Sequence, residues 1–207
     1  GLTSSDGDNI ICSGASVIFT ATGGTTYEFF VDGTSVQSGA GTTYTTTSLQ
    51  NGEAVTVRAT NTSGCSTVSS GITTVVNANP VASLVSSDAD NIICAGAGVT
   101  FTGAPVGVNY NFRVNGTSVQ SGALNTYTTT ALINNNSVDV IVTSASGCTG
   151  TSAAVVMTVN PNPVAGLSSS DGDNIICSGA SVIFTDPRDL PSVFSGRSTG
   201  LQSGAGT

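Results

Sequence analysis

One short segment occurs three times in the chain, and this repetition constrains the fold more than any single residue does. Ser5–Thr20 reads SDGDNIICSGASVIFT, Ser170–Thr185 repeats the same letters, and Ser87–Thr102 carries a close relative. The copies begin 82 and 83 positions apart. A period of this size lies within the range of a small domain and is typical of a tandem array. The chain is therefore predicted to be a row of small domains.

The joints between the domains are predicted at two Asn-Pro steps. Asn79-Pro80 and Asn162-Pro163 stand 83 positions apart, and each precedes a new copy of the repeated segment. Proline stiffens the chain and removes a backbone donor, so it is suited to a short linker. We expect domains at 1–80 and 81–163, and a partial third at 164–207. Within the third, residues 186–201 depart from the repeat.

Apolar residues alternate with polar ones inside each period, which predicts β-strands with one buried face. The positions that stay apolar in both copies are Val17, Phe19, Tyr27, Phe29 and Val31, and their counterparts Val99, Phe101, Tyr110, Phe112 and Val114. Asp32-Gly33 and Asn115-Gly116 suit type I′ hairpin turns. The expected fold is all-β: tandem immunoglobulin-like antiparallel β-sandwiches of about seven strands each.

The cysteines recur in register with the repeat. Cys12 and Cys65 lie 53 positions apart, and Cys94 and Cys148 lie 54 apart. This spacing predicts one disulfide per domain, Cys12–Cys65 and Cys94–Cys148. Cys177 repeats the position of Cys12 and Cys94, and its partner would lie beyond the printed sequence. Disulfides of this kind are typical of proteins exported to an oxidising space, so we expect an extracellular or cell-surface location.

Charge and composition argue against several functions. The chain carries twelve Asp and Glu against four Arg, a net charge of −8, which disfavours nucleic acid and anionic lipid as partners. No apolar run approaches the ~20 residues that span a bilayer, so membrane insertion of this segment is not expected. The chain has no His and no Lys, and so it lacks the usual general base and the Schiff-base amine. A non-enzymatic role is expected.

The DxDN segments are the sharpest local feature, and they lie near the predicted joints. Two carboxylates and an amide oxygen are ligands suited to Ca²⁺, which takes six to eight oxygens. The alternative is an Asx-type turn, in which these side chains bond the local backbone. The candidate calcium ligands are Asp6, Asp8, Asn9, Asp88, Asp90, Asn91, Asp171, Asp173 and Asn174. No other cofactor is expected.

Several phrases resemble a known family. SSDADNIICAGAGVTFT, YEFFVDGTSVQSGAGTTYTTTSL and VTVRATNTSGC are similar to the immunoglobulin-like and PKD-like repeats of giant surface proteins of Bacteroidota. Gliding-motility adhesins and related type IX-secreted proteins carry such arrays. The resemblance covers Gly1–Thr185 well and Asp186–Leu201 poorly. It implies an extracellular stalk or filament that projects adhesive ends, and it implies no catalytic residues.

The expected function is that of a structural repeat array in an extracellular adhesin or surface filament. Its expected partners are neighbouring copies of the repeat, other chains in a filament, and surface glycans. A glycan- or surface-binding module is the first alternative, with the threonine runs Thr42–Thr47 and Thr128–Thr130 as a hydroxyl-rich face. Accessory domains of a secreted hydrolase are the second. The half copy at Gly166–Thr185 is expected to mark a fragment boundary, and the alternative is that another chain completes its strands.

Overall fold

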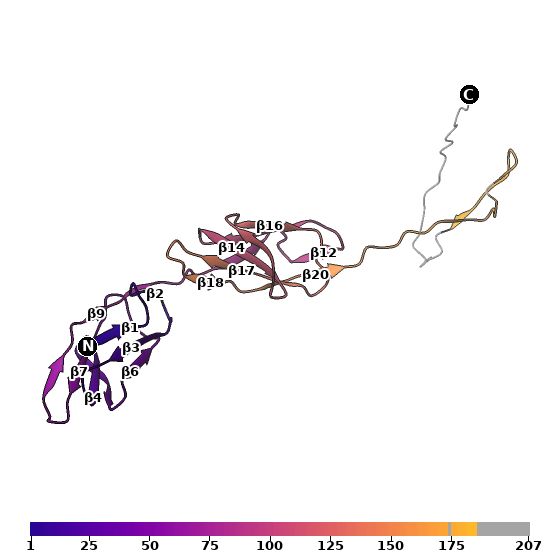
Figure 1. Cartoon of the computed structure of the whole chain (residues 1–207). Coiled ribbons are helices and arrows are strands. Elements are labelled where there is room, and N and C mark those ends of the chain that lie inside the picture. The colour runs from indigo at the N-terminus through magenta and orange to yellow at the C-terminus, as the bar shows by residue number, and fades with distance from the viewer. Residues whose placement is uncertain (174, 186–207) are drawn as a thin grey trace. The chain divides into compact units, whose positions relative to one another are not determined.

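The computed structural model describes residues 1–173 and 175–185, which form strands and turns without any helix. By its contacts the chain divides into one unit at Gly1–Asn160 and another at Pro161–Thr207. The first unit contains two β-sandwiches, each with its own hydrophobic cluster. Figure 1 shows the first sandwich in indigo to purple and the second in magenta to orange. The boundaries 1–80, 81–163 and 164–207 stay predictions.

The first sandwich is built from ten short strands. They are β1 (Leu2–Ser4), β2 (Ile10–Cys12), β3 (Val17–Ala21), β4 (Thr26–Val31), β5 (Thr34–Gly39), β6 (Thr43–Thr46), β7 (Ala54–Thr60), β8 (Ser66–Val68), β9 (Ile72–Thr73) and β10 (Val75–Asn77). One sheet has the order β1-β3-β6 and the other β5-β4-β7-β8, with β9 also pairing β7. A separate pair, β2 and β10, runs parallel.

The second sandwich repeats this order. Its strands are β11 (Ser83–Ser86), β12 (Ile92–Cys94), β13 (Val99–Ala104), β14 (Asn109–Val114), β15 (Thr117–Gly122), β16 (Thr126–Thr129), β17 (Ser137–Thr143), β18 (Thr149–Thr151), β19 (Val155–Val156) and β20 (Thr158–Asn160). The sheets are β11-β13-β16 and β15-β14-β17-β18, with β19 on β17 and a parallel β12–β20 pair.

The prediction of tandem immunoglobulin-like sandwiches is confirmed. If β1 with β2 is read as one interrupted strand, and β8, β9 and β10 as another, each sandwich has the seven strands that the sequence pattern predicts. The first strand then pairs with one sheet through β1 and with the last strand through β2, as immunoglobulin-like folds do. The interruptions arise because the first and last strands change their pairing partners along their length.

The residues that the alternation selects are buried in the cores, except that Val31 and Val114 are half-buried and pack against them. Phe19 and Phe29 are fully buried in the first sandwich, and Phe101 and Phe112 in the second. Tyr44 lies between the two sheets, with its ring centroid 6.4 Å from that of Phe19 and 5.8 Å from that of Phe29. Burial of aromatic rings of this size dominates the stability of a small domain.

The predicted hairpin turns are confirmed by the backbone. Asp32 and Gly33 have φ values of 45° and 80°, and Asn115 and Gly116 have 51° and 77°. Positive φ at both central residues is what a type I′ turn requires. The Asp32 carboxylate also accepts the backbone N–H of Ala54 at 2.9 Å, which ties this turn to the start of β7.

Each five-stranded sheet carries one ion pair on its outer face, at different positions in the two copies. Arg113 donates from Nε and Nη2 to the two oxygens of Asp139 at 2.7 and 2.8 Å. This hydrogen bonding raises the pKa of Arg113 above its ordinary value. In the first copy Arg58 pairs with Glu28 and lies over the ring of Phe30. The positions that alternate with the core therefore tolerate charge, as the pattern predicts.

In the second unit the structure describes one antiparallel pair, β21 (Ser168–Ser169) with β22 (Phe184–Thr185). This pair corresponds to β1 and β3 of a complete copy. The candidate ligand Asn174 and the divergent stretch 186–201 lie outside the described residues.

Candidate functional site: a disulfide joint between the sandwiches

The cysteines pair between the two sandwiches and not within them. Cys12 of the first copy is bonded to Cys148 of the second, across 136 positions of sequence and with a Cα–Cα distance of 5.5 Å. Cys65 and Cys94 are exposed thiols. The predicted bridges Cys12–Cys65 and Cys94–Cys148 are therefore wrong, and so is the expectation of one disulfide per domain.

Strand direction explains the error. Cys12 is the last residue of β2 and precedes β3, and Cys65 lies after β7. Five successive antiparallel strands, β3 to β7, run between them. An odd number of crossings puts the two cysteines at opposite ends of the sandwich. The seven residues of β7 alone span about 20 Å, whereas a disulfide needs Cα atoms within about 7 Å. Counting the predicted strands would have excluded the pairing from sequence.

The Cys12 side of the joint is formed by the parallel β2–β10 pair. Cys12 lies opposite Asn77, and the N–H of Ser13 donates to the carbonyl of Asn77 at 2.8 Å. The side-chain amide of Asn79 donates to the carbonyl of Ser13 at 3.0 Å. These bonds hold the end of the last strand and the start of the linker beside Cys12, so the chain leaves the first sandwich next to its half of the bridge.

The Cys148 side is the tight hairpin between β17 and β18. The N–H of Ser144 donates to the carbonyl of Cys148 at 2.8 Å, and the N–H of Gly147 donates to that of Ser144 at 3.0 Å. Gly147 has a φ of 79°, which suits glycine in such a turn. Cys148 is only 1% exposed, and its sulfur lies 3.9 Å from the carbonyl oxygen of Asn77.

Gly150 lets the hairpin approach the linker closely. A Cβ atom at this position would overlap the carbonyl oxygen of Pro80 and would lie 2.9 Å from its carbonyl carbon. The residue at the same register in the first copy is Thr67, since Thr67 pairs with Ala59 as Gly150 pairs with Val142. Glycine is therefore required here by a neighbouring backbone, a reason that the sequence alone does not show.

The DxDN segments form the Asx-type turns that were the alternative to calcium binding. Asp6 and Asp8 each accept the N–H of Ile10, at 3.1 and 3.0 Å, and Asp88 and Asp90 accept that of Ile92 at 3.0 Å. Two carboxylates thus converge on one amide in each of the first two copies. In the third copy the pKa of Asp173 is lowered, first by the side chain of Asp171 and then by the N–H of Ile175.

In the first two copies, the amide oxygens of these turns have no hydrogen-bond partner among the described residues. Asn9 and Asn91 have positive φ, and their Oδ1 atoms are buried without a hydrogen bond to the described residues. Among the described residues, no group of three or more His, Cys, Asp or Glu side chains is arranged to hold a metal ion. Calcium at these turns stays a prediction, which an experiment can decide.

Calcium binding at Asp88 and Asp90 predicts a higher melting temperature in Ca²⁺ and a lower one after chelation. Ca²⁺ at about 100 times its Kd would stabilise the folded state by about 2.7 kcal/mol. Differential scanning calorimetry of the wild type and of Asp88→Ala measures this, with Asp32→Asn as a control carboxylate. If Ca²⁺ does not change the melting temperature of either protein, these residues only form the hydrogen-bonded turn and do not bind calcium.

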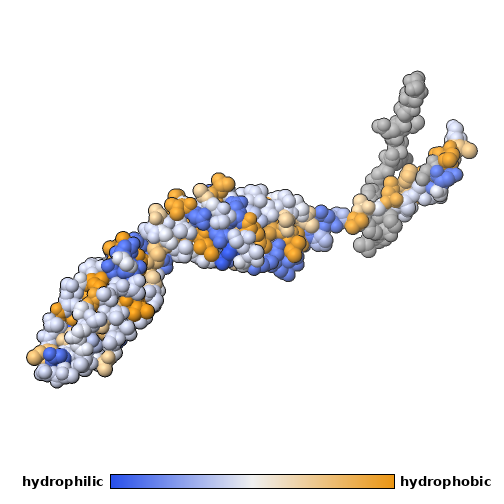
Figure 2. Space-filling view, viewed as in Figure 1, coloured by the Kyte–Doolittle hydropathy of each residue, from blue (hydrophilic) through white to orange (hydrophobic). Residues whose placement is uncertain are grey.

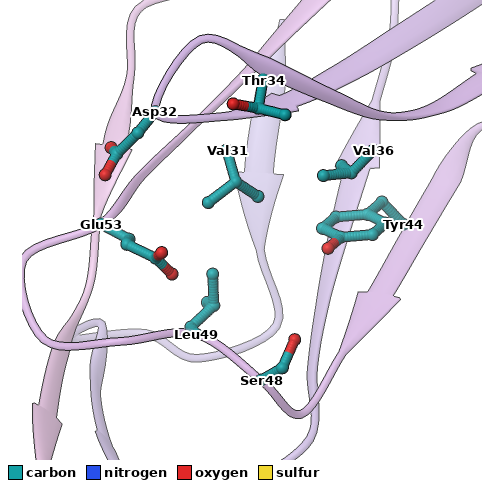
Figure 3. A pocket seen from close by; sticks show the side chains of 8 residues that line it. All are labelled: Val31, Asp32, Thr34, Val36, Tyr44, Ser48, Leu49 and Glu53. Carbon is teal, nitrogen blue, oxygen red and sulfur yellow. The ribbon is translucent and has the colours of Figure 1, made fainter.

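One pocket opens in the first sandwich beside the β4–β5 turn, with a volume of about 330 Å³. Figure 3 shows Asp32 and Glu53 on one side of it, and Val36 and Tyr44 on the other. The pocket is lined by Val31, Asp32, Thr34, Val36, Tyr44, Ser48, Leu49 and Glu53. This pair of carboxylates is not part of any motif that the sequence pattern predicts as a site.

Hydrogen bonds account for the two pocket carboxylates. Glu53 accepts the N–H of Gln50 at 2.8 Å, as Asp32 accepts that of Ala54. In the second copy the amide side chains of Asn115 and Asn136 make the same bonds, each at 2.9 Å. Because neutral amide oxygens accept the same hydrogen bonds in the second copy, a charged side chain is not required at these positions. Asp32 and Glu53 therefore cap turns of the backbone. An alignment of the two copies would have revealed this role, because it places each carboxylate opposite an asparagine.

Charged residues make up only 8% of the chain, so its surface carries few charges. Figure 2 shows pale residues over most of the face in view, with apolar and strongly polar ones scattered between them. The threonine runs fall on β6 and β16, and Thr100 and Thr128 join their hydroxyls at 2.8 Å across the β13–β16 pair. None of the described residues forms a helix long and apolar enough to cross a membrane.

Comparisons with known proteins extend no further than the fold. No protein-family model matches the chain, and no curated protein matches it. The fibronectin(III)-like modules of Clostridium thermocellum CbhA share 16% identity at a TM-score of 0.44, over 78% of this chain and 95% of theirs. Murine CEACAM1b shares 11% at 0.37, over 77% and 100%. A 1.5-MDa bacterial ice-binding adhesin shares 16% at 0.35, over 79% and 65%.

Identities and TM-scores of this size carry no argument about function. The fold and the joint define the chain as tandem immunoglobulin-like β-sandwiches, two of which are connected by an interdomain disulfide.

Proposed function

We propose that the chain is a structural repeat segment of an extracellular adhesin or surface filament and serves as a mechanically robust stalk without catalysis. The phrases quoted from Ser86–Thr102 and Tyr27–Leu49 support a giant surface protein of the Bacteroidota type, secreted by the type IX route. The disulfide supports an oxidising, extracellular location. The absence of His and Lys from the sequence supports a role without general-base chemistry.

The Cys12–Cys148 bridge is the observation that carries this proposal. It closes a loop of 136 positions that contains every strand from β3 to β17. Tension applied at the two ends of the chain passes from Gly1–Cys12 through the sulfur atoms to the segment after Cys148. The strands from β3 to β17 are thereby relieved of the load, whereas β1, β2 and β18 to β20, which lie outside the loop, still carry it. Such a bypass would preserve a stalk under force and has no evident use in a freely diffusing enzyme.

Stretching the oxidised protein between handles at Gly1 and Thr207 tests the proposal. Fully extended chain spans about 3.3–3.6 Å per residue, so the bridge prevents the loop from adding roughly 450 Å to the end-to-end distance of the stretched chain. Reduction is expected to release this length when both sandwiches unfold, and Cys148→Ser should release it without reductant. Cys65→Ser should behave as the wild type. Equal lengthening of the oxidised and reduced proteins would contradict a load-bearing joint.

The glycan-binding alternative has a separate test. The hydroxyl rows on β6 and β16 are the observation that favours it, because Thr100 and Thr128 lie on the outer face of a sheet. A stalk segment is expected to show no saturable binding of soluble polysaccharides in isothermal titration calorimetry. Saturable binding would favour a binding module instead if Thr128→Val weakens it. Thr45→Val is the matched change in the first copy and tests the equivalent row there.

A further inference from the structure

We propose that Cys94 is one half of a second joint like the Cys12–Cys148 joint, and that its partner is the hairpin cysteine of another repeat of the Cys148 type. The inference goes beyond the proposed function, because it assigns a docking surface and a covalent partner whatever load the array carries. It rests on the correspondence between the two copies at the residues that form the observed joint.

The backbone around Cys94 matches that around Cys12. The parallel β12–β20 pair places Cys94 opposite Asn160, as β2–β10 places Cys12 opposite Asn77. The N–H of Ala95 donates to the carbonyl of Asn160 at 2.9 Å, where Ser13 donates to Asn77 at 2.8 Å. The same turn follows each cysteine. The N–H of Ala15 donates to the carbonyl of Cys12, and the N–H of Ala97 donates to that of Cys94, both at 3.0 Å.

Exposure distinguishes Cys94 from its counterpart Cys12. Cys12 is half-buried and bonded, whereas Cys94 is an exposed thiol. The exposed cysteine thus has the backbone setting of a bonded one and a sulfur that another chain segment can reach. The other half of the observed joint, Cys148, is 1% exposed once it is bonded.

The partner hairpin must also have a small residue two positions after its cysteine. In the observed joint that residue is Gly150, whose missing side chain admits the backbone of Pro80. The hairpin of the first copy has the same turn, with Gly64 at a φ of 81°, but it carries Thr67 at the critical position. The Cys65 hairpin is therefore the poorer partner, and a hairpin like that of Cys148 is the fitting one.

A second joint of this kind would interleave with the first. Cys94 lies in sequence between Cys12 and Cys148, so a bond from Cys94 to a later repeat closes a loop that overlaps the existing one. Neither loop can then open without breaking its own disulfide. The bond forms when two thiols lose two protons and two electrons to an external small-molecule disulfide such as oxidised glutathione, which is reduced to two thiols.

The test adds one complete repeat to the protein. A chain of residues 1–163 followed by a second copy of residues 81–163 is oxidised in a glutathione buffer, digested without reduction and mapped by mass spectrometry. Each repeat brings its own core, so the added copy is expected to fold. The expected bridges are Cys12–Cys148 and Cys94 to the Cys148 of the added copy, which leaves Cys65 and the added Cys94 as thiols.

Controls make the outcome decisive. Cys94→Ser should free the added Cys148 and leave Cys12–Cys148 intact, and in the 207-residue chain Cys94 should react fully with iodoacetamide. A Gly150→Thr change confined to the added copy should suppress the new bridge alone. The proposal is overturned if Cys94 stays a thiol in the extended chain, if it pairs within its own repeat, or if Cys12–Cys148 does not form.

Discussion

Replacing Gly150 by threonine is expected to prevent the Cys12–Cys148 disulfide from forming in a glutathione buffer that bridges the wild type. A Cβ atom at this position would overlap the carbonyl oxygen of Pro80, which is backbone and cannot rotate away. Gly150 lies in strand β18 without a positive φ, so threonine suits its local conformation. The second sandwich should therefore fold, and only its approach to the linker should fail.

The matched control is Thr67→Gly, the reverse change in the first copy. Thr67 is exposed on β8, so this variant should keep the Cys12–Cys148 bridge. Peptide mapping without reduction measures both proteins, and circular dichroism verifies that the strands form. A Gly150→Thr protein that is bridged to the same extent as the wild type would show that the hairpin can shift to accommodate a side chain.

Replacing Met157 by threonine is expected to destabilise the second sandwich by about 2–4 kcal/mol, because it removes buried apolar atoms and buries a hydroxyl. Met157 is fully buried, and the equivalent residue of the first copy is Thr74, only 1% exposed. The backbone bonds are the same in the two copies: Met157 donates to Asn136 at 2.9 Å, and Thr74 donates to Glu53 at 3.0 Å. Only the side chains differ.

The reciprocal change should stabilise the first sandwich. The Oγ1 atom of Thr74 is buried and makes no hydrogen bond to the described residues. Thr74→Val keeps the shape of the side chain and removes the unpaired hydroxyl. The change is expected to raise the free energy of unfolding of the first sandwich by about 1 kcal/mol. Urea unfolding of each variant under oxidising conditions measures both effects. A Thr74→Val protein less stable than the wild type would mean that the hydroxyl is hydrogen-bonded in solution.

Most of the architecture was predictable because the repeat supplies its own comparison. Positions that stay apolar in both copies, such as Phe29 and Phe112, are the buried ones. Positions that exchange charge for amide or apolar residues, such as Glu28 and Asn111, lie on the outer faces of the sheets. Two aligned copies separate residues kept for packing from residues free to vary, and periodicity then assigns each to a face.

The candidate sites were less predictable because they depend on which ends of the strands meet. Equal spacing of Cys12–Cys65 and Cys94–Cys148 in sequence is a consequence of the repeat and carries no information about distance. The pocket residues Asp32 and Glu53 likewise lie 21 positions apart and meet only through the hairpin of β4 and β5 and the loop before β7.

The sequence by itself determined that the chain is a row of β-sandwiches, because alternating burial and glycine turns are local properties of each repeat. Only the tertiary structure decided that Cys12 bonds Cys148. Five antiparallel strands carry the chain from one end of the sandwich to the other, so Cys12 lies at the end that meets the next repeat, beyond the reach of Cys65. Gly150 then admits the hairpin to the linker, which is a contact between segments distant in sequence.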